Sequence, residues 1–64
     1  MRIELDPELR PTLSVDETAI VLGIGRATAY EGVRTGDIPA IRVGRRLRVP
    51  TAAIVRMLAG EARS

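Results

Sequence analysis

The chain has 64 residues, of which 45% are hydrophobic and 28% are charged, with a formal net charge of +2. It contains no cysteine and no histidine, which excludes disulfides, thiolate or imidazole metal sites, and any nucleophile paired with an imidazole base. We therefore expect one small domain that is not an enzyme, with no catalytic residue, no metal site and no cofactor.

The charges are divided unevenly along the chain. Residues 1–24 carry two arginines against five carboxylates, a net charge of −3, whereas residues 25–64 carry eight arginines against three carboxylates, a net charge of +5. Every basic residue is an arginine, whose planar fork suits phosphates and guanine edges, although a codon-usage bias would give the same count. A basic half of this kind indicates a polyanionic partner, either a nucleic acid or an anionic membrane surface.

The first 13 residues fit two local structures. Residues 2–5 alternate as a strand does, while residues 6–9 (Asp-Pro-Glu-Leu) are typical of a capped helical turn. The sequence leaves both open.

The next stretch, "SVDETAIVLG", predicts a helix of about eight residues. Ser14 and Glu17 form a capping box, acidic residues occupy the first turn, and Gly23 ends the helix. Its core-facing side is predicted to hold Val15, Thr18, Ala19 and Leu22.

Ile20 lies nearly opposite that side of the helical wheel. We expect it to be covered by the N-terminal segment through Ile3, Leu5 or Leu9, or else by a partner protein.

A second helix is predicted over residues 26–34, with Gly25 as its N-cap and Gly36 ending it before a proline. Two short helices joined so tightly form a helix-turn-helix, whose second helix can enter a major groove. Ala29 and Val33 should face the core. Gly32 should lower the stability of the helix by about 1 kcal/mol relative to alanine. The outer face is predicted to carry Ala27, Thr28, Glu31 and Arg34, with Tyr30 on the flank.

The stretch "IRVGRRLRVP", residues 41–50, predicts a β-hairpin. A two-residue turn would set apolar side chains opposite arginines, whereas a three-residue loop, residues 44–46, pairs Val43 with Leu47 and keeps one face apolar. We therefore expect the second register. It places Arg42 directly across from Arg48, an unfavourable pair unless an anion lies between the two guanidinium groups. The alternative is that both groups are splayed into solvent.

A final helix is predicted after Pro50. Thr51 is the expected N-cap, Gly60 the expected C′ residue, and the expected inward side chains are Ile54, Met57 and Leu58. Residues 61–64 are expected to fray.

Residues 13–58 resemble the excisionase-type branch of the MerR-like DNA-binding domains. The matching stretches are "LSVDETAIVLGI", "RATAY", "RTGDIPAIRVGRRLRVP" and "IVRML". The resemblance implies a mainly α winged helix-turn-helix with a two-stranded wing and a C-terminal helix. It also implies that the second helix reads the major groove while the wing lies along the backbone or in the minor groove. Members of this branch include recombination directionality factors, which bend DNA beside an attachment site and help an integrase excise, and small transcription regulators.

The sequence departs from that pattern at several positions. Glu31 and Gly32 stand where a basic and a larger apolar residue are expected, and Gly25 stands where a Ser or Thr cap is usual. Ile20 and Val55 are apolar at positions that commonly carry charge.

We therefore predict a DNA-binding domain over residues 13–60, preceded by an extension over residues 1–12. Its partners are expected to be double-stranded DNA and a site-specific recombinase (an integrase). One such module buries only about 600–1,000 Å² on DNA, so cooperative self-association on DNA is expected as well. The predicted contacts come from the second helix, through Arg26, Ala27, Thr28, Tyr30, Glu31 and Arg34, and from the wing, through Arg42, Arg45, Arg46 and Arg48.

Several alternatives stand beside these contacts. The wing arginines could be solvated, Tyr30 could fill the core, and Glu31 could pair with Arg34 instead of accepting from cytosine. For the whole protein the alternatives are a small transcriptional regulator or a protein-interaction module such as an antitoxin. No apolar run reaches the about 20 residues of a membrane span, no signal-peptide pattern opens the chain, and the basic residues cluster on a hairpin. We therefore expect a cytoplasmic, nucleoid-associated protein that does not bind membranes.

Overall fold

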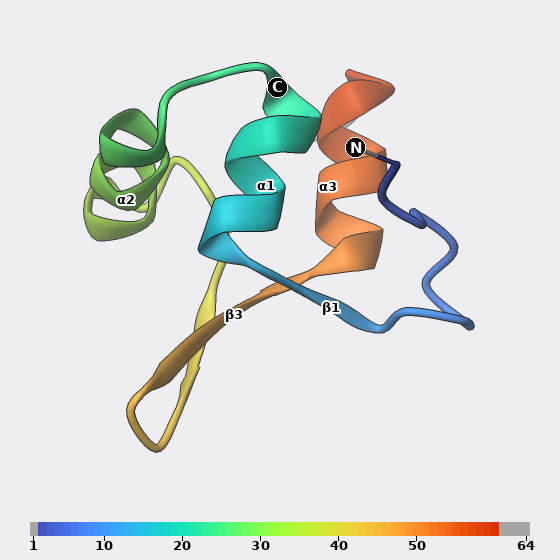
Figure 1. Ribbon diagram of the computed structural model, residues 1–64, viewed down its shortest axis with the longest axis horizontal. Coiled ribbons are helices and arrows are strands. Elements are labelled where there is room, and N and C mark those ends of the chain that lie inside the picture. The colour runs from blue at the N-terminus through green and yellow to red at the C-terminus, as the bar shows by residue number, and fades with distance from the viewer. Residues whose placement is uncertain (1, 61–64) are drawn as a thin grey trace.

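The computed structural model describes residues 2–60, which form three helices and a three-stranded antiparallel sheet (Figure 1). The strands lie in the order β1-β3-β2, and the hairpin of β2 and β3 projects from the body as a wing. The predicted fold class, a mainly α helix-turn-helix with a wing, is confirmed. The elements in chain order are β1 (Thr12–Ser14), α1 (Val15–Leu22), α2 (Arg26–Thr35), β2 (Ile41–Val43), β3 (Arg46–Pro50) and α3 (Thr51–Leu58).

Helix α1 begins with the predicted capping box. The Ser14 hydroxyl accepts from the Glu17 amide at 3.0 Å, and the Glu17 carboxylate accepts from the Ser14 amide at 2.9 Å. Gly23 ends the helix in the left-handed region, with a φ of 71°. Val15 and Ala19 are buried, as expected, and the buried Thr18 hydroxyl donates to the Ser14 carbonyl at 2.9 Å.

Helix α2 begins after Gly25 and extends one residue beyond the predicted end. The structure accounts for the glycine inside it. A Cβ at position 32 would lie 2.8 Å from Cδ1 of Ile38, and the Ile38 amide donates to the Gly32 carbonyl at 3.0 Å. Gly32 therefore allows the buried Ile38 to pack directly against the backbone of α2.

The core lies where α1 and α3 pack on the sheet and α2 packs on α1. Ala29 is fully buried and Val33 packs at the edge of the core, as predicted. The buried apolar side chains that form one cluster are Leu13, Val15, Ala19, Ala29, Ile38, Val49 and Ile54.

Two details of α3 differ from the prediction. Pro50, not Thr51, is the N-cap, because Pro50 is the last residue with extended backbone (φ −60°, ψ 124°), and the amide of Thr51 donates to the Pro11 carbonyl at 2.9 Å. Ile54 is buried and Met57 packs against the core, but Leu58 is 53% exposed. Leu58 belongs to the last turn of α3, which lies at the end of the helix away from the sheet (Figure 1).

The N-terminal segment packs on the body of the protein. A turn forms at residues 6–9, where the Leu9 and Arg10 amides both donate to the Asp6 carbonyl, and residues 2–5 form no strand. Ile3 and Leu5 pack against the core cluster, and Arg10 forms an ion pair with Glu17. The segment is therefore tied to the start of α1.

The expectation that this segment covers Ile20 is wrong. Ile20 is 48% exposed and Leu9 is 72% exposed, because Ile3 and Leu5 fill the edge of the core instead. The predicted domain boundary after residue 12 stays a prediction, although β1 begins at Thr12. The predicted fraying of residues 61–64 concerns residues outside the described range.

The predicted register of the wing is also wrong. Val43 pairs with Arg46, Ile41 with Arg48, and Arg42 with Leu47, across a two-residue turn of Gly44 and Arg45. Gly44 has a φ of 61° and Arg45 a negative φ, which is the φ pattern of a type II′ hairpin turn. The register of a strand pair is enforced when one of its faces is buried. The wing projects beyond the core, so its register is set by the turn instead (Figure 1).

Candidate nucleic-acid interface

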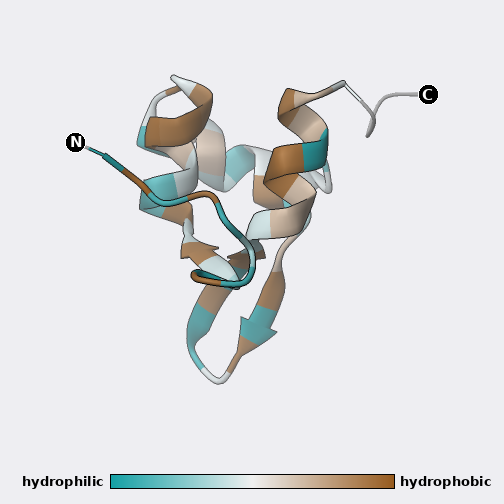
Figure 2. Ribbon diagram, turned by 90° about the vertical axis from the view of Figure 1, so that its right-hand side faces the viewer, coloured by the Kyte–Doolittle hydropathy of each residue, from teal (hydrophilic) through white to brown (hydrophobic). Residues whose placement is uncertain are grey.

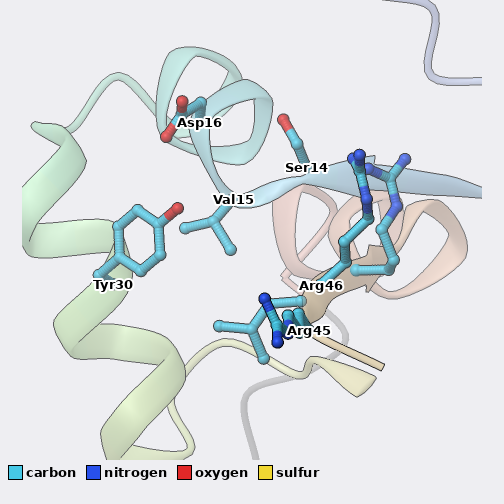
Figure 3. Close-up of a pocket in the computed structure, with 8 residues that line it drawn as sticks. Ser14, Val15, Asp16, Tyr30, Arg45 and Arg46 are labelled. Carbon is cyan, nitrogen blue, oxygen red and sulfur yellow. The ribbon is translucent and has the colours of Figure 1, made fainter. Parts of the chain in front are cut away.

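A crevice of about 260 Å³ separates the start of α1, the middle of α2 and the wing. Figure 3 shows Tyr30 and Val15 facing each other on one side of it, with the wing arginines on the other. Three guanidinium groups and one carboxylate border this space, so it is a polar, mainly basic crevice. Its lining consists of Ser14, Val15, Asp16, Tyr30, Arg45, Arg46, Leu47 and Arg48.

Arg26 lies beside this crevice and links the two helices of the helix-turn-helix. Its Nε lies 2.9 Å from Oδ1 of Asp16 on α1, and its guanidinium carbon lies 5.6 Å from the centre of the Tyr30 ring on α2. The polar contact with Tyr30, and next the negative charge of Asp16, raise the pKa of Arg26. Tyr30 is 41% exposed, so the alternative that it fills the core is wrong.

The outer face of α2 carries a second ion pair. Nε of Arg34 donates to Oε1 of Glu31 at 3.1 Å, and Nη2 of Arg34 donates to Oε2 of the same carboxylate. The hydrogen bond from Arg34 lowers the pKa of Glu31. The alternative that Glu31 pairs with Arg34 is therefore confirmed, and this part of α2 presents two opposite charges. Ala27 and Thr28 are exposed beside it, as expected.

The wing has two unlike faces. One carries Arg46 and Arg48 together with Ile41 and Val43, which are 50% and 60% exposed. Apolar and polar stretches alternate along the projecting hairpin (Figure 2). The other face carries Arg42 opposite Leu47. Because Arg42 and Arg48 are on opposite faces, the predicted anion clamp between them is wrong.

Arg48 differs from the other wing arginines in having partners on β1. Its Nε donates to the Thr12 hydroxyl at 3.1 Å and its Nη2 to the Thr12 carbonyl at 3.4 Å. Within residues 2–60, no carboxylate lies within ion-pair distance of Arg42, Arg45 or Arg46. These three cations are exposed and available to an external anion.

The fold thus sorts the predicted contact residues into three groups. Tyr30 and the wing arginines 45, 46 and 48 border the crevice, with Arg26 beside it. The other residues of α2 lie on its exposed side, and Arg42 lies opposite Leu47, on the face of the wing that does not carry Arg46 and Arg48. Sequence reasoning missed Asp16 and Thr12 as partners of the arginines, because both contacts join residues that are distant in the chain.

Residues 12–62 match the helix-turn-helix domain family. The chain belongs to this family. It is 44% identical over 45 residues to a protein named "Probable excisionase" from Saccharopolyspora erythraea, covering 70% of this chain and 46% of that protein. It is 41% identical over 46 residues to "Putative DNA-binding protein Rv0500A" from Mycobacterium tuberculosis, covering 72% of this chain and 59% of that protein.

The chain therefore spans about half the length of the curated relatives it matches. No solved structure matches it. Among the helices of residues 2–60, none is long and apolar enough to cross a membrane.

Proposed function

We propose that this domain binds double-stranded DNA with α2 in the major groove and the wing against the adjacent backbone and minor groove. The observation that carries the proposal is the set of exposed arginines on the wing, 42, 45 and 46, none of which has a carboxylate partner in the described chain. Exposed guanidinium groups without a carboxylate partner bind phosphates through charge-assisted hydrogen bonds. Membership of the helix-turn-helix domain family supports the same interpretation.

Each face of the wing then has a role. Arg45 at the turn and Arg46 beside the crevice reach the phosphates next to the groove that α2 occupies. Ile41 and Val43 lie on the same face as Arg46 and contact sugar and base edges, since minor-groove proteins combine arginine with apolar side chains. Arg42 reaches phosphates from the opposite face of the wing.

The finer function that we propose is that of an excisionase, an architectural partner of an integrase in site-specific recombination. It is supported by the relative named "Probable excisionase" and by the resemblance of the sequence to the excisionase-type branch of MerR-like domains. Cooperative binding of adjacent copies fits this role, because a single module contacts too little DNA for high specificity. A small transcriptional regulator is the second candidate, and the relative from Mycobacterium tuberculosis carries only a DNA-binding name.

Fluorescence anisotropy with a labelled random-sequence duplex at several salt concentrations tests DNA binding. Replacing Arg45 and Arg46 with alanine should reduce the slope of log affinity against log salt by about two units, since each arginine that binds a phosphate contributes about one. Arg56→Ala is the matched control, because it removes an exposed arginine from α3 and should leave the slope unchanged. A slope unaffected by the wing substitutions contradicts the proposed orientation.

Two further assays separate the finer alternatives. In a recombination assay with the integrase encoded nearest to this gene, an excisionase raises excision and suppresses integration. A regulator leaves both reactions unchanged and binds upstream of a promoter. Titrating duplexes with one, two or three adjacent sites tests cooperativity, and equal affinity per site in all of them contradicts it.

A further inference from the structure

Among residues 2–60, Asp16 is the one carboxylate that lines the crevice, and it contacts a cation that belongs to the other helix. Its Oδ1 lies 2.9 Å from Nε of Arg26, the first residue of α2. The Tyr30 ring, one turn further along α2, lies 5.6 Å from the same guanidinium. Two groups from two helices therefore restrict one long, otherwise flexible side chain.

Stability alone gives little reason for this arrangement. The Arg26 side chain is 72% exposed and the Asp16 side chain 54% exposed, and ion pairs in such positions stabilise a fold weakly. A cation in the first turn of a helix also opposes the helix dipole, and α2 has no acidic residue there to offset it.

The atoms in contact leave part of Arg26 available. The 2.9 Å contact to Asp16 is made by Nε, at the root of the guanidinium, and not by the terminal donors Nη1 and Nη2. This end of the side chain is the fork that matches two acceptors lying side by side.

We propose that Asp16 is a positioning residue for base recognition, which together with Tyr30 orients Arg26 so that its terminal nitrogens donate to O6 and N7 of a guanine. This inference rests on the proposed DNA-binding function and names the base that α2 reads. Asp16 itself does not contact the DNA.

The charge of Asp16 favours a base over a phosphate as the partner of Arg26. A carboxylate 2.9 Å from the guanidinium repels a second anion placed against the same group. The guanine edge presents two neutral acceptors in the major groove and avoids this repulsion. The wing arginines 42, 45 and 46, which have no such carboxylate within the described chain, are the phosphate ligands by the same reasoning.

Selection from a randomised duplex library, followed by sequencing, identifies the bases that the full chain prefers. We expect one position to be fixed as guanine with the wild-type protein. Asp16→Asn should reduce the preference for guanine at that position about tenfold while affinity for a scrambled duplex stays equal or rises, since a negative charge is lost. Arg26→Lys should lose the same preference but keep the salt dependence, because lysine retains the charge and lacks the fork.

Glu8→Gln is the matched control for charge. Glu8 is exposed in the N-terminal turn, so its substitution should alter affinity for all duplexes equally and keep the guanine preference. A thermal melt of each variant ensures that only folded protein is compared.

Two results overturn the inference while leaving the proposed function intact. In the first, Asp16→Asn keeps the full guanine preference. In the second, it raises affinity for the preferred and scrambled duplexes by the same factor, which makes Asp16 a competitor of DNA. If the wild-type protein binds no duplex at any salt concentration, the proposed function fails, and the inference fails with it.

Discussion

The two helices of the helix-turn-helix begin in opposite ways. At the start of α1, Ser14 and Glu17 satisfy each other's amides, and Asp16 and Glu17 place negative charge where the helix dipole favours it. At the start of α2, Gly25 offers no side-chain acceptor and Arg26 places positive charge in the first turn. The two starts are close in space, since Asp16 and Arg26 form an ion pair.

The difference separates residues that stabilise the fold from residues that face a ligand. The start of α1 follows every local rule for helix stability, and Arg10 from the N-terminal segment adds an ion pair to its Glu17. The start of α2 breaks those rules without a compensating contact of its own backbone. Local rules are broken most often at functional sites, so the start of α2 is where binding should be tested.

The largest effect should come from Arg26→Ala at the start of α2. We expect the affinity for a preferred duplex to fall by about 1–3 kcal/mol, the usual cost of removing a bidentate interaction with guanine. The melting temperature should change little, because the ion pair of Arg26 is exposed. Anisotropy titrations and thermal melts of the same samples measure both quantities. If Arg26→Ala lowered the melting temperature strongly and left the affinity for DNA unchanged, the start of α2 would serve stability and not binding.

At the start of α1, Ser14→Ala should produce the opposite pattern. It removes the hydroxyl that caps the Glu17 amide at 3.0 Å, which costs about 1 kcal/mol. In a domain of this size, a loss of that order lowers the melting temperature by roughly 4–8 °C. The base preference of the folded variant should be that of the wild type. An altered base preference at full stability would place the start of α1 in the reading surface instead.

These expectations depend on elements that the sequence predicts to different degrees. The starts and ends of α1 and α2 are predicted within one residue, because caps such as Ser14, Gly23 and Gly36 act over a few neighbouring residues. The sequence does not predict strand β1, because a pattern of three residues is too short to distinguish a strand from the residues that precede a helix.

The wing and the interface between the helices are harder to predict. The apolar pattern of residues 41–49 favours a register that a buried face would enforce, but Ile41 and Val43 are exposed and the turn at Gly44 decides the pairing. The contact between Asp16 and Arg26 depends on the angle between two helices, which local pattern does not determine. The sequence locates the outward face of α2 and the wing, but it does not identify the partner of each arginine.

A smaller effect should appear as pH dependence at the start of α1. The hydrogen bond from the Ser14 amide lowers the pKa of Glu17 against the opposing effect of desolvation, and the charge of Arg10 lowers it further. A depressed pKa in the folded state stabilises the protein above the unfolded value, about 4.3, and this contribution is lost as the pH falls through the folded value.

Glu17→Gln should therefore flatten the acid side of a plot of melting temperature against pH. Glu31→Gln on α2 is the control, since the pKa of Glu31 is also lowered, by Arg34, but this pair is exposed to solvent. Equal flattening by both substitutions would mean that the capping box adds nothing beyond an exposed ion pair.

The smallest effect should come from giving α2 the cap that it lacks. Gly25 has a φ of −70° and a ψ of 157°, which any residue adopts, and a Cβ there would lie 4.0 Å from the Thr28 hydroxyl. Gly25→Ser should therefore fit without strain and stabilise the helix by a few tenths of a kcal/mol, the usual difference between glycine and serine caps. It leaves the charge and the fork of Arg26 in place, so the base preference should not change. A melt and a library selection on this variant separate the missing cap from the arginine. If Gly25→Ser removed the guanine preference, the open start of α2, and not the orientation of Arg26, would be what the DNA requires.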